Sequence, residues 1–313
     1  MIAVIIPSYK VKNHILDVLA AIGSNVSMIY VVDDSCPDNS GNFVKTNTTD
    51  SRIKIIYHDK NKGVGGAVLS GYKQAIADGA RIIIKLDGDG QMNPDYIEKL
   101  ILPIEKGEAD YTKGNRFYDI EKLLVMPRIR LIGNSCLSLI NKIVNGYWNV
   151  VDPTNGFTAI HIDTLKLIPL HKIDNRYFFE SDMLFRLSVL RAVVKDVPIP
   201  AHYGDEESNL KIRRVLWEFP LKYTNRFFKR FFYNYLLRDF NAGTIQILGG
   251  LLAIITGLAF GIYHWIVSYQ MMVTTPTGTV MISILLIILG FQLLLGALNF
   301  DVQNIPNNPI QKQ

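Results

Sequence analysis

Short apolar runs and amphipathic stretches alternate along residues 1–210. Helical patterns lie at residues 15–22, 67–77, 93–107, 127–146 and 177–190. The strands predicted between and beside them lie at residues 2–6, 28–32, 53–57, 82–84, 111–116, 158–162 and 193–199. Strands that alternate with helices predict βαβ units. The fold class that we expect is therefore α/β, with a Rossmann-like, mostly parallel sheet.

The pattern changes after Asp239, because no Asp, Glu, Lys or Arg occurs between it and Asp301. Two apolar spans in this interval, at about residues 245–267 and 279–298, are each long enough to cross a hydrocarbon core of roughly 30 Å. We expect a two-helix transmembrane hairpin over residues 241–300, followed by a cytoplasmic tail at residues 301–313 that is disordered from residue 304. A pair of buried core helices in a soluble domain is the alternative.

Charge is distributed unevenly along the chain. Residues 1–210 carry a net charge of −1 and residues 211–313 a net charge of +6, so the total of +5 comes from the C-terminal part. In residues 211–240, aromatic side chains interleave with basic ones such as Lys222 and Arg226. This composition is typical of amphipathic helices in the interface of an anionic lipid bilayer, and we do not expect nucleic-acid binding.

The flanking charges also predict a topology. Basic residues precede the first apolar span, whereas the connecting residues 268–278 carry none. By the positive-inside rule, residues 1–240 and the tail are cytoplasmic, and we expect an integral protein of a bacterial inner membrane. The chain thus divides into an α/β domain (1–210), juxtamembrane helices (211–240), the hairpin and the tail. A homo-oligomer is left open, because close helix packing would be allowed by Gly249, Gly250, Gly257 and Gly261.

One stretch carries the strongest chemical signal, the sequence LDGDGQ at residues 86–91, directly after the apolar run at 82–84. Asp87 and Asp89 can bind one divalent cation, while Gly88 between them lets a diphosphate approach the main chain. The carboxyl end of a buried strand is where open α/β sheets place ligands. A ligand-free Asp-Gly turn is the alternative, since Asp and Gly are common turn residues.

Acidic and glycine-rich loops follow other strands as well. Asp33 and Asp34 end the run at 28–32, and Gly63 begins a glycine-rich loop after residues 53–57. Because the carboxyl ends of parallel strands share one edge, these carboxylates would crowd one rim with Asp87 and Asp89. Like charges so placed are unfavourable unless a cation or a polar ligand offsets them, so bound Mg²⁺ or Mn²⁺ is the better interpretation.

Residues later in the chain add candidates. Arg116 ends the predicted strand at 111–116 and could hold a phosphate with two hydrogen bonds, although a lone loop arginine can also be a solvated surface group. Arg128 and Arg130 begin a helix, where the N-terminus also favours anions. Asp152 begins a tight turn. Asp182, near the start of the helix at 177–190, is either a helix-dipole partner or a catalytic carboxylate.

These motifs together resemble family-2 GT-A glycosyltransferases. The specific likeness is to the polyprenyl-phosphate group, which includes dolichol-phosphate mannose synthase and the bacterial enzymes that load undecaprenyl phosphate. The resemblance covers most of residues 2–160, and the C-terminal apolar helices fit the bacterial members. The matching pieces are IPSY at 6–9, VVDDS at 31–35, NKG at 61–63 with Ala67 and Gly71, DGDGQ at 87–91, Arg128, Arg130, and DPTNGF at 152–157.

The resemblance implies a GT-A fold with a donor site for a UDP- or GDP-sugar. Asp87 and Asp89 would hold Mg²⁺ or Mn²⁺ and the donor diphosphate, and Arg116 would lie near the donor phosphates. The nucleotide would be lined by Pro7, Tyr9, Asp33 or Asp34, Gly63, Gly88 and Gln91.

The resemblance also implies an acceptor site for polyprenyl phosphate, at which Arg128 and Arg130 would meet the lipid phosphate. The chain departs from the family pattern here, with His202 and Ser208-Asn209 in place of an arginine and a Ser-Lys pair. It also has Lys10-Val11 where an acidic residue is common near the donor.

The first functional hypothesis is inverting transfer of a sugar to undecaprenyl or dolichyl phosphate at the cytoplasmic membrane face. A phosphate acceptor is already anionic, so it needs cations rather than a strong base, and the leaving diphosphate needs its charge neutralised. Asp89, Arg128 and Arg130 would carry this chemistry, and Asp152 is the first candidate for an orienting carboxylate or base.

A second hypothesis is transfer to a sugar hydroxyl of a lipid-linked or membrane glycan. A hydroxyl needs a carboxylate base within hydrogen-bond reach, for which Glu180 and Asp182 are the candidates. A third hypothesis is a non-enzymatic membrane scaffold that keeps a nucleotide-sugar fold, which the intact acidic rim disfavours.

Overall fold

The computed structural model describes residues 1–118, 128–200 and 212–312, without the side chains of residues 128–130 and 212–216. The chain forms two compact units. Met1–Phe227 and Pro306–Gln313 make up the first unit, and Phe228–Ile305 the second.

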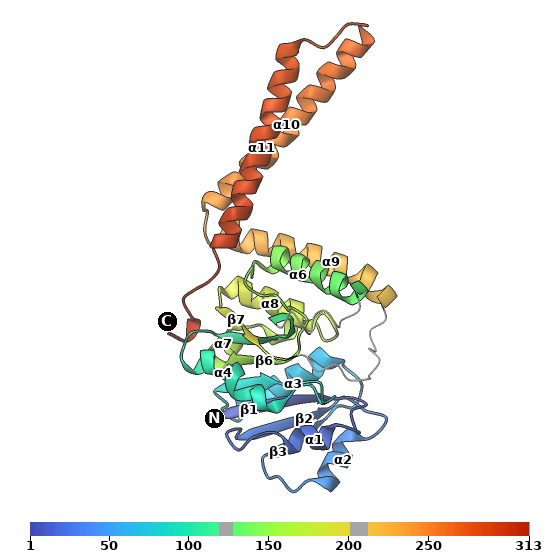
Figure 1. Cartoon of the computed structure of the whole chain (residues 1–313), viewed down its shortest axis with the longest axis vertical. Coiled ribbons are helices and arrows are strands. Elements are labelled where there is room, and N and C mark those ends of the chain that lie inside the picture. Colours follow the sequence, from blue (N-terminus) through green and yellow to red (C-terminus); the bar gives the residue numbers. More distant parts are fainter. Residues whose placement is uncertain (119–127, 201–211, 313) are drawn as a thin grey trace. The chain divides into compact units, whose positions relative to one another are not determined.

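A seven-stranded sheet is the frame of the first unit within the described residues (Figure 1). In spatial order its strands are β3 (Ile53–Tyr57), β2 (Met28–Asp33), β1 (Ile2–Ser8), β4 (Ile82–Lys85), β6 (Thr158–His161), β5 (Tyr111–Asn115) and β7 (Val194–Pro198). Among these strands, β6 runs antiparallel to β4 and β5, and the other neighbouring pairs are parallel. The expected α/β class with a mostly parallel sheet is confirmed, whereas the reversal of β6 was not predicted.

Helices cover both faces of the sheet. In the first unit they are α1 (Ile15–Ala20), α2 (Ser40–Asn47), α3 (Val64–Ala77), α4 (Ile97–Glu105), α6 (Arg128–Asn145), α7 (Ile162–Leu167), α8 (Phe179–Leu190) and the larger part of α9 (Ile212–Phe231). Alternate strand residues point to opposite faces. Ala3 and Ile5 therefore pack with α3, α7 and α8, whereas Val4 and Ile6 pack with α1, α2 and α4.

The register brings the carboxyl ends of several strands together at one edge. Asp33 of β2 lies opposite Ser8 of β1, and Lys85 of β4 lies opposite Ile5 of β1. Thr158, the first residue of β6, lies opposite Lys85. Because β6 is reversed, the turn that precedes it lies at the same edge as the loop after β4. This edge is where open α/β sheets bind ligands.

The second unit contains two long apolar helices, α10 (Ala242–Gln270) and α11 (Thr277–Gln303), preceded by a π-helical turn, Phe232–Leu237. Both helices are long and apolar enough to cross a membrane, and only 11% and 17% of their most apolar windows are buried. So much exposed apolar surface does not fit the alternative of core helices in a soluble domain. Asn241 and Thr244 form a capping box that fixes the start of α10.

The glycines of the hairpin pack within one chain. Gly250 and Gly257 are buried, and the Ser283 hydroxyl donates a 2.8 Å hydrogen bond to the Gly257 carbonyl. A β-carbon at Gly261 would collide with Ser283. These three positions close α10 against α11, so they give no support to the homo-oligomer that the sequence left open.

Residues 306–312 pack against the first unit, so the expected disorder of the tail is wrong. The backbone N–H groups of Ile310 and Gln311 donate hydrogen bonds of 3.0 and 3.2 Å to the carboxylate of Asp110. The Gln311 side chain donates to the carbonyls of Ile104 and Ala109 at 3.1 and 2.7 Å. Asp110 is fully buried, and a buried carboxylate needs such donors.

Gln311→Ala tests the docked tail, because it removes both side-chain hydrogen bonds. We expect the free energy of unfolding to fall by about 1–2 kcal/mol, since the Ala109 carbonyl loses the Gln311 donor and the Ile104 carbonyl keeps only the Gly107 N–H. The measurement is thermal or denaturant unfolding of the detergent-solubilised protein. The matched control is Gln74→Ala, which removes one exposed hydrogen bond to Asp78 and should leave stability almost unchanged. Equal effects of the two substitutions would contradict the docking.

Candidate active site

A cavity of about 360 Å³ opens at the carboxyl edge of the sheet. Arg176 and Tyr177, which the sequence analysis did not single out, contribute to its wall. The lining residues that the sequence analysis proposed for nucleotide or metal are Pro7, Tyr9, Asp34, Gly63, Asp87, Gly88 and Asp89. We call this space the donor cavity. The described residues that line it do not include Asp33 or Gln91.

Asp33 and Asp34 build the loops beside the donor cavity. The Asp33 carboxylate accepts hydrogen bonds from the N–H groups of Cys36 and Gly41 at 2.7 and 2.6 Å, and thereby holds the start of α2. The Asp34 carboxylate accepts the N–H groups of Lys62 and Gly63, both at 2.8 Å, and contacts a ring nitrogen of His58 at 2.7 Å. Backbone donors and His58 therefore offset two of the four carboxylates for which the sequence suggested a metal.

Lys85 is buried beneath the Asp-Gly-Asp motif. Its Nζ atom lies 2.9 Å from Asp87 Oδ1 and 3.1 Å from Glu180 Oε1, and its side chain is only 1% exposed. Burial alone would lower the pKa of Lys85, but the two carboxylates outweigh burial and raise the pKa above its ordinary value, so Lys85 is a cation at neutral pH. A β-carbon at Gly156 would collide with the ends of the Lys85 and Asp87 side chains, so a larger residue there would displace this ion pair.

Asp87 and Asp89 are the carboxylates available for a divalent cation. Both line the donor cavity, and Asp89 Oδ1 accepts the Gln91 N–H at 3.0 Å. Among the described residues, no group of three or more His, Cys, Asp or Glu side chains forms a closed metal cage. Mg²⁺ commonly binds through one or two carboxylates and completes its shell with water and substrate phosphates. The residues therefore fit a cation that is shared with a diphosphate.

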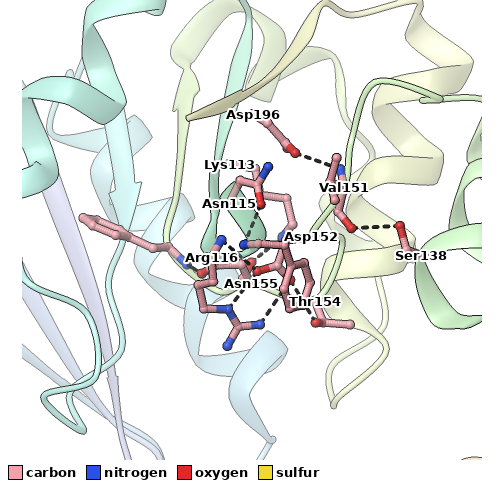
Figure 2. Close-up of polar contacts among 11 residues, drawn as sticks. Lys113, Asn115, Arg116, Ser138, Val151, Asp152, Thr154, Asn155 and Asp196 are labelled. Atoms are coloured by element: carbon pink, nitrogen blue, oxygen red, sulfur yellow. Dashed lines mark hydrogen bonds and ion pairs between the residues drawn. The ribbon is translucent and has the colours of Figure 1, made fainter. Parts of the chain in front are cut away.

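Arg116 and Asp152 form a partly buried ion pair (Figure 2). The Arg116 side chain donates from Nε to Asp152 Oδ2 at 2.7 Å and from Nη2 to Oδ1 at 3.1 Å. Asp152 is fully buried, and Thr154 donates a further hydrogen bond of 3.3 Å to it. Asp152 therefore orients the Arg116 guanidinium. Because no part of the Asp152 side chain is exposed, Asp152 is not placed to act as a base.

We call a second cavity of about 360 Å³ the α6 cavity, and its described lining does not include Arg116 or Asp152. Phe117 and Val151, neighbours of Arg116 and Asp152 in the sequence, line it, and the Ser138 hydroxyl donates to the Val151 carbonyl at 2.8 Å (Figure 2). The remaining wall comes from α6, through Leu131, Asn134, Ser135, Ser138, Leu139 and Lys142. The side chains of Arg128 and Arg130 lie outside the described residues, as do His202, Ser208 and Asn209.

Two further charged groups near this turn were missed from the sequence. Lys113 is fully buried and donates to the Asn155 carbonyl, and burial lowers the pKa of Lys113 to about 8. Asp196 accepts the Val151 N–H at 2.7 Å, and burial raises the pKa of Asp196 to about 6 (Figure 2). Both groups hold the turn that carries Asp152. For Lys113, the sequence signal that could have revealed a buried charge was its position inside the predicted strand at 111–116.

The two candidates for a hydroxyl-activating base are engaged elsewhere. Glu180 is paired with Lys85. Asp182 is fully buried, lies 2.6 Å from Arg226 Nε, and is not among the described residues that line either cavity. This placement does not match the expected role of Asp182 as a base.

Comparison with known proteins decides the family. Residues 3–167 match the model for glycosyl transferase family 2. The chain belongs to this family. The glycosyltransferase is 31% identical to a UDP-N-acetylglucosamine–dolichyl-phosphate N-acetylglucosaminyltransferase of Methanococcus voltae, over 66% of the chain and 87% of that relative. It is 30% identical to an undecaprenyl-phosphate mannosyltransferase of Micrococcus luteus, over 62% of the chain and 81% of that relative.

Solved structures show the same fold for the glycosyltransferase. Glucosyl-3-phosphoglycerate synthase from Mycobacterium tuberculosis, determined with Mn²⁺, UDP and glucosyl-3-phosphoglycerate, superposes with a TM-score of 0.55 at 15% identity. The match covers 74% of this chain and 79% of that one. The same synthase with Mg²⁺ and UDP gives a TM-score of 0.50. The GT-A fold expected from the sequence is thus confirmed.

Lys85→Met tests the buried ion pair of the glycosyltransferase. Removing the ammonium leaves Asp87 and Glu180 as partly buried charges without their shared partner, so we expect a loss of about 2–4 kcal/mol in the free energy of unfolding. Lys54→Met is the control, because it breaks an exposed ion pair with Asp78. An unfolding midpoint that shifts no more for Lys85→Met than for the control would show that the buried pair is not a stability determinant.

Asp196→Asn tests the raised pKa of Asp196 in the glycosyltransferase. The folded pKa of about 6 lies above the unfolded value of about 3.9, so this group's contribution to stability is fully present below about pH 4 and is lost as the pH rises through 6. We expect the variant to gain up to about 3 kcal/mol on the wild type between about pH 4 and pH 7. Urea unfolding at both pH values measures this gain. Asp38→Asn is the control, because this carboxylate is exposed, and its stability should change with pH as that of the wild type does. The same result for Asp196→Asn would show that the pKa of Asp196 is not raised.

Proposed function

We propose that the enzyme transfers a sugar from a UDP- or GDP-sugar to a polyprenyl phosphate at the cytoplasmic face of a bilayer. The observation that carries the proposal is the pair of cavities in the first unit, one lined by Asp87 and Asp89 and one lined by Phe117 and Val151, the sequence neighbours of the Arg116–Asp152 ion pair. The names of the relatives from Methanococcus voltae and Micrococcus luteus support a dolichyl or undecaprenyl phosphate acceptor.

The donor cavity supplies the site for the nucleotide-sugar. Asp87 and Asp89 would hold Mg²⁺ or Mn²⁺ together with the diphosphate, and the cation would neutralise charge on the leaving nucleoside diphosphate. Lys85 keeps Asp87 oriented for this role. The solved neighbours that contain Mn²⁺ or Mg²⁺ with UDP support this assignment.

The α6 cavity suits the head of a lipid phosphate. Arg116, fixed by Asp152, presents a planar cation of the kind that binds phosphate oxygens, and this role differs from the donor-side role expected from the sequence. Apolar residues of the cavity, such as Phe117 and Leu131, would contact the first isoprene units. The outer surface of α6 is apolar as well, which suits contact with a bilayer, through Ile132, Leu139, Ile140 and Ile143.

The reaction is a single displacement. The bond between the anomeric carbon and the diphosphate oxygen breaks, its electron pair leaves with the nucleoside diphosphate, and a phosphate oxygen of the acceptor forms the new bond with inversion. A phosphate monoester is ionised at neutral pH, so no base has to remove a proton. The ion-paired state of Glu180 and Asp182 therefore favours a phosphate acceptor over the hydroxyl acceptor of the second hypothesis.

We further propose that α10 and α11 anchor the enzyme in a bacterial inner membrane with its first unit in the cytoplasm. The exposed apolar surface of both helices and the basic residues that precede α10 in the sequence support this orientation.

Initial-rate measurements with purified enzyme, Mn²⁺, a panel of UDP- and GDP-sugars and undecaprenyl phosphate test the proposal. Product should form with one of the donors, and EDTA should abolish its formation. Undecaprenol, which lacks the acceptor phosphate, should give no product. Transfer to a glycan but not to undecaprenyl phosphate would make the second hypothesis correct. Failure to use any donor would instead favour the scaffold.

Asp152→Asn tests the role of the Arg116 ion pair within this reaction. The substitution keeps the side-chain shape but removes the charge that orients the guanidinium. We expect kcat to fall about 100-fold, the range seen when one preorganised donor is lost, with little change in the donor KM. Asp163→Asn, at a side chain that is 59% exposed, is the control. A wild-type kcat in Asp152→Asn would exclude the ion pair from catalysis.

A further inference from the structure

The donor cavity has a cationic residue that no motif assigns. Its charged lining residues are Asp34, Asp87, Asp89 and Arg176, so Arg176 is the only cation at its wall among the described residues. The Arg176 side chain is exposed. A nucleoside diphosphate is an anion, and a guanidinium can hold it with two parallel hydrogen bonds. The position and charge of Arg176 therefore suit the donor.

Arg176 lies on a turn that is packed against the start of α3. The Gly66 N–H donates a 2.9 Å hydrogen bond to the Asn175 carbonyl. A β-carbon at Gly63 would lie 2.7 Å from the same carbonyl oxygen, and one at Gly65 would lie 2.5 Å from the Asp174 carbonyl oxygen. Glycine at these positions lets the turn approach the cavity.

Two carboxylates fasten this turn to the part of α9 that belongs to the first unit. Asp174 accepts the Arg176 N–H at 2.9 Å through Oδ1, and its Oδ2 lies 2.6 Å from Lys222 Nζ. Asp182 accepts the Asp174 N–H at 2.9 Å and lies 2.6 Å from Arg226 Nε. A continuous chain of hydrogen bonds therefore joins α9 to the wall of the donor cavity.

Lys222 and Arg226 also contact aromatic rings of the first unit. Lys222 Nζ lies 5.4 Å from the ring centre of Phe178, and the Arg226 guanidinium lies 5.4 Å from that of Phe185. The exposed residues of α9 include the apolar Trp217 and Leu221, which are 82% and 76% exposed.

We propose that Arg176 binds the diphosphate of the donor, and that Lys222 and Arg226 are positioning residues that hold the Arg176 turn in place. This inference rests on the proposed function, because it names a further residue of the same donor site. It makes donor binding depend on the docking of α9, the helix that the sequence pattern assigns to the membrane interface.

Calorimetric titration of the full-length enzyme in detergent with UDP and GDP, in the presence of Mn²⁺, tests Arg176. Arg176→Gln should weaken nucleotide binding roughly tenfold to a hundredfold, because charge-assisted hydrogen bonds are lost, and Arg176→Lys should recover part of the affinity. Arg81→Gln is the matched control, since Arg81 is exposed and precedes β4 at the opposite end of that strand.

The outcomes separate this inference from the proposed function. If the wild type binds a nucleotide and Arg176→Gln binds it equally well, the assignment of Arg176 is wrong while the proposed function stands. If the wild type binds neither nucleotide, the proposed function is wrong and this inference falls with it.

Steady-state kinetics test the positioning role. Lys222→Met should raise the donor KM roughly tenfold and leave the KM for polyprenyl phosphate unchanged, and Lys222→Arg should restore the donor KM. Lys229→Met is the matched control, because Lys229 is an exposed lysine of the same helix. Equal rises in both KM values, or the same effect from the control, would overturn the positioning role.

Discussion

The buried ammonium of Lys85 is the charge on which the active-site edge depends. A lysine that is 1% exposed is stable only beside opposite charges, and Asp87 supplies one from the loop after β4 and Glu180 another from α8. Gly156 leaves the space for this arrangement. One charge therefore joins the loop after β4 to the start of α8.

A buried charge needs an opposite charge or hydrogen-bond donors beside it, and this need also explains how one edge can carry so many carboxylates. Each buried carboxylate that builds a loop has its own donors: Asp34 uses backbone N–H groups, Asp152 uses Arg116, and Asp182 uses Arg226. Asp87, which is paired with Lys85, and Asp89 both line the donor cavity, where they would meet a cation and a diphosphate under the proposed function.

Local patterns in the sequence predicted the strands, most of the helices, the Asp-Gly-Asp motif and the apolar hairpin, because each depends on residues close together in the chain. The contacts that define roles join distant segments. Lys85 and Glu180 are 95 residues apart, and Ile310 and Asp110 are 200 apart. Asp182 resembled a base because its position at a helix start can be seen in the sequence. Its ion pair with Arg226 cannot be seen there, because it forms only in the folded structure. The lysines inside β4 and β5 were a local sign of buried polar contacts, an ion pair for Lys85 and a hydrogen bond to a carbonyl for Lys113.

Attack by a phosphate oxygen, rather than by a sugar hydroxyl, is the central claim, and the lipid product reports it directly. Phosphorus-31 NMR of undecaprenyl phosphate, taken after incubation with enzyme, donor and Mn²⁺, distinguishes a phosphomonoester from a phosphodiester, because only the monoester titrates at about pH 6. We predict a new phosphodiester signal that does not shift with pH. A monoester signal that persists while the sugar is transferred to another acceptor would contradict the claim.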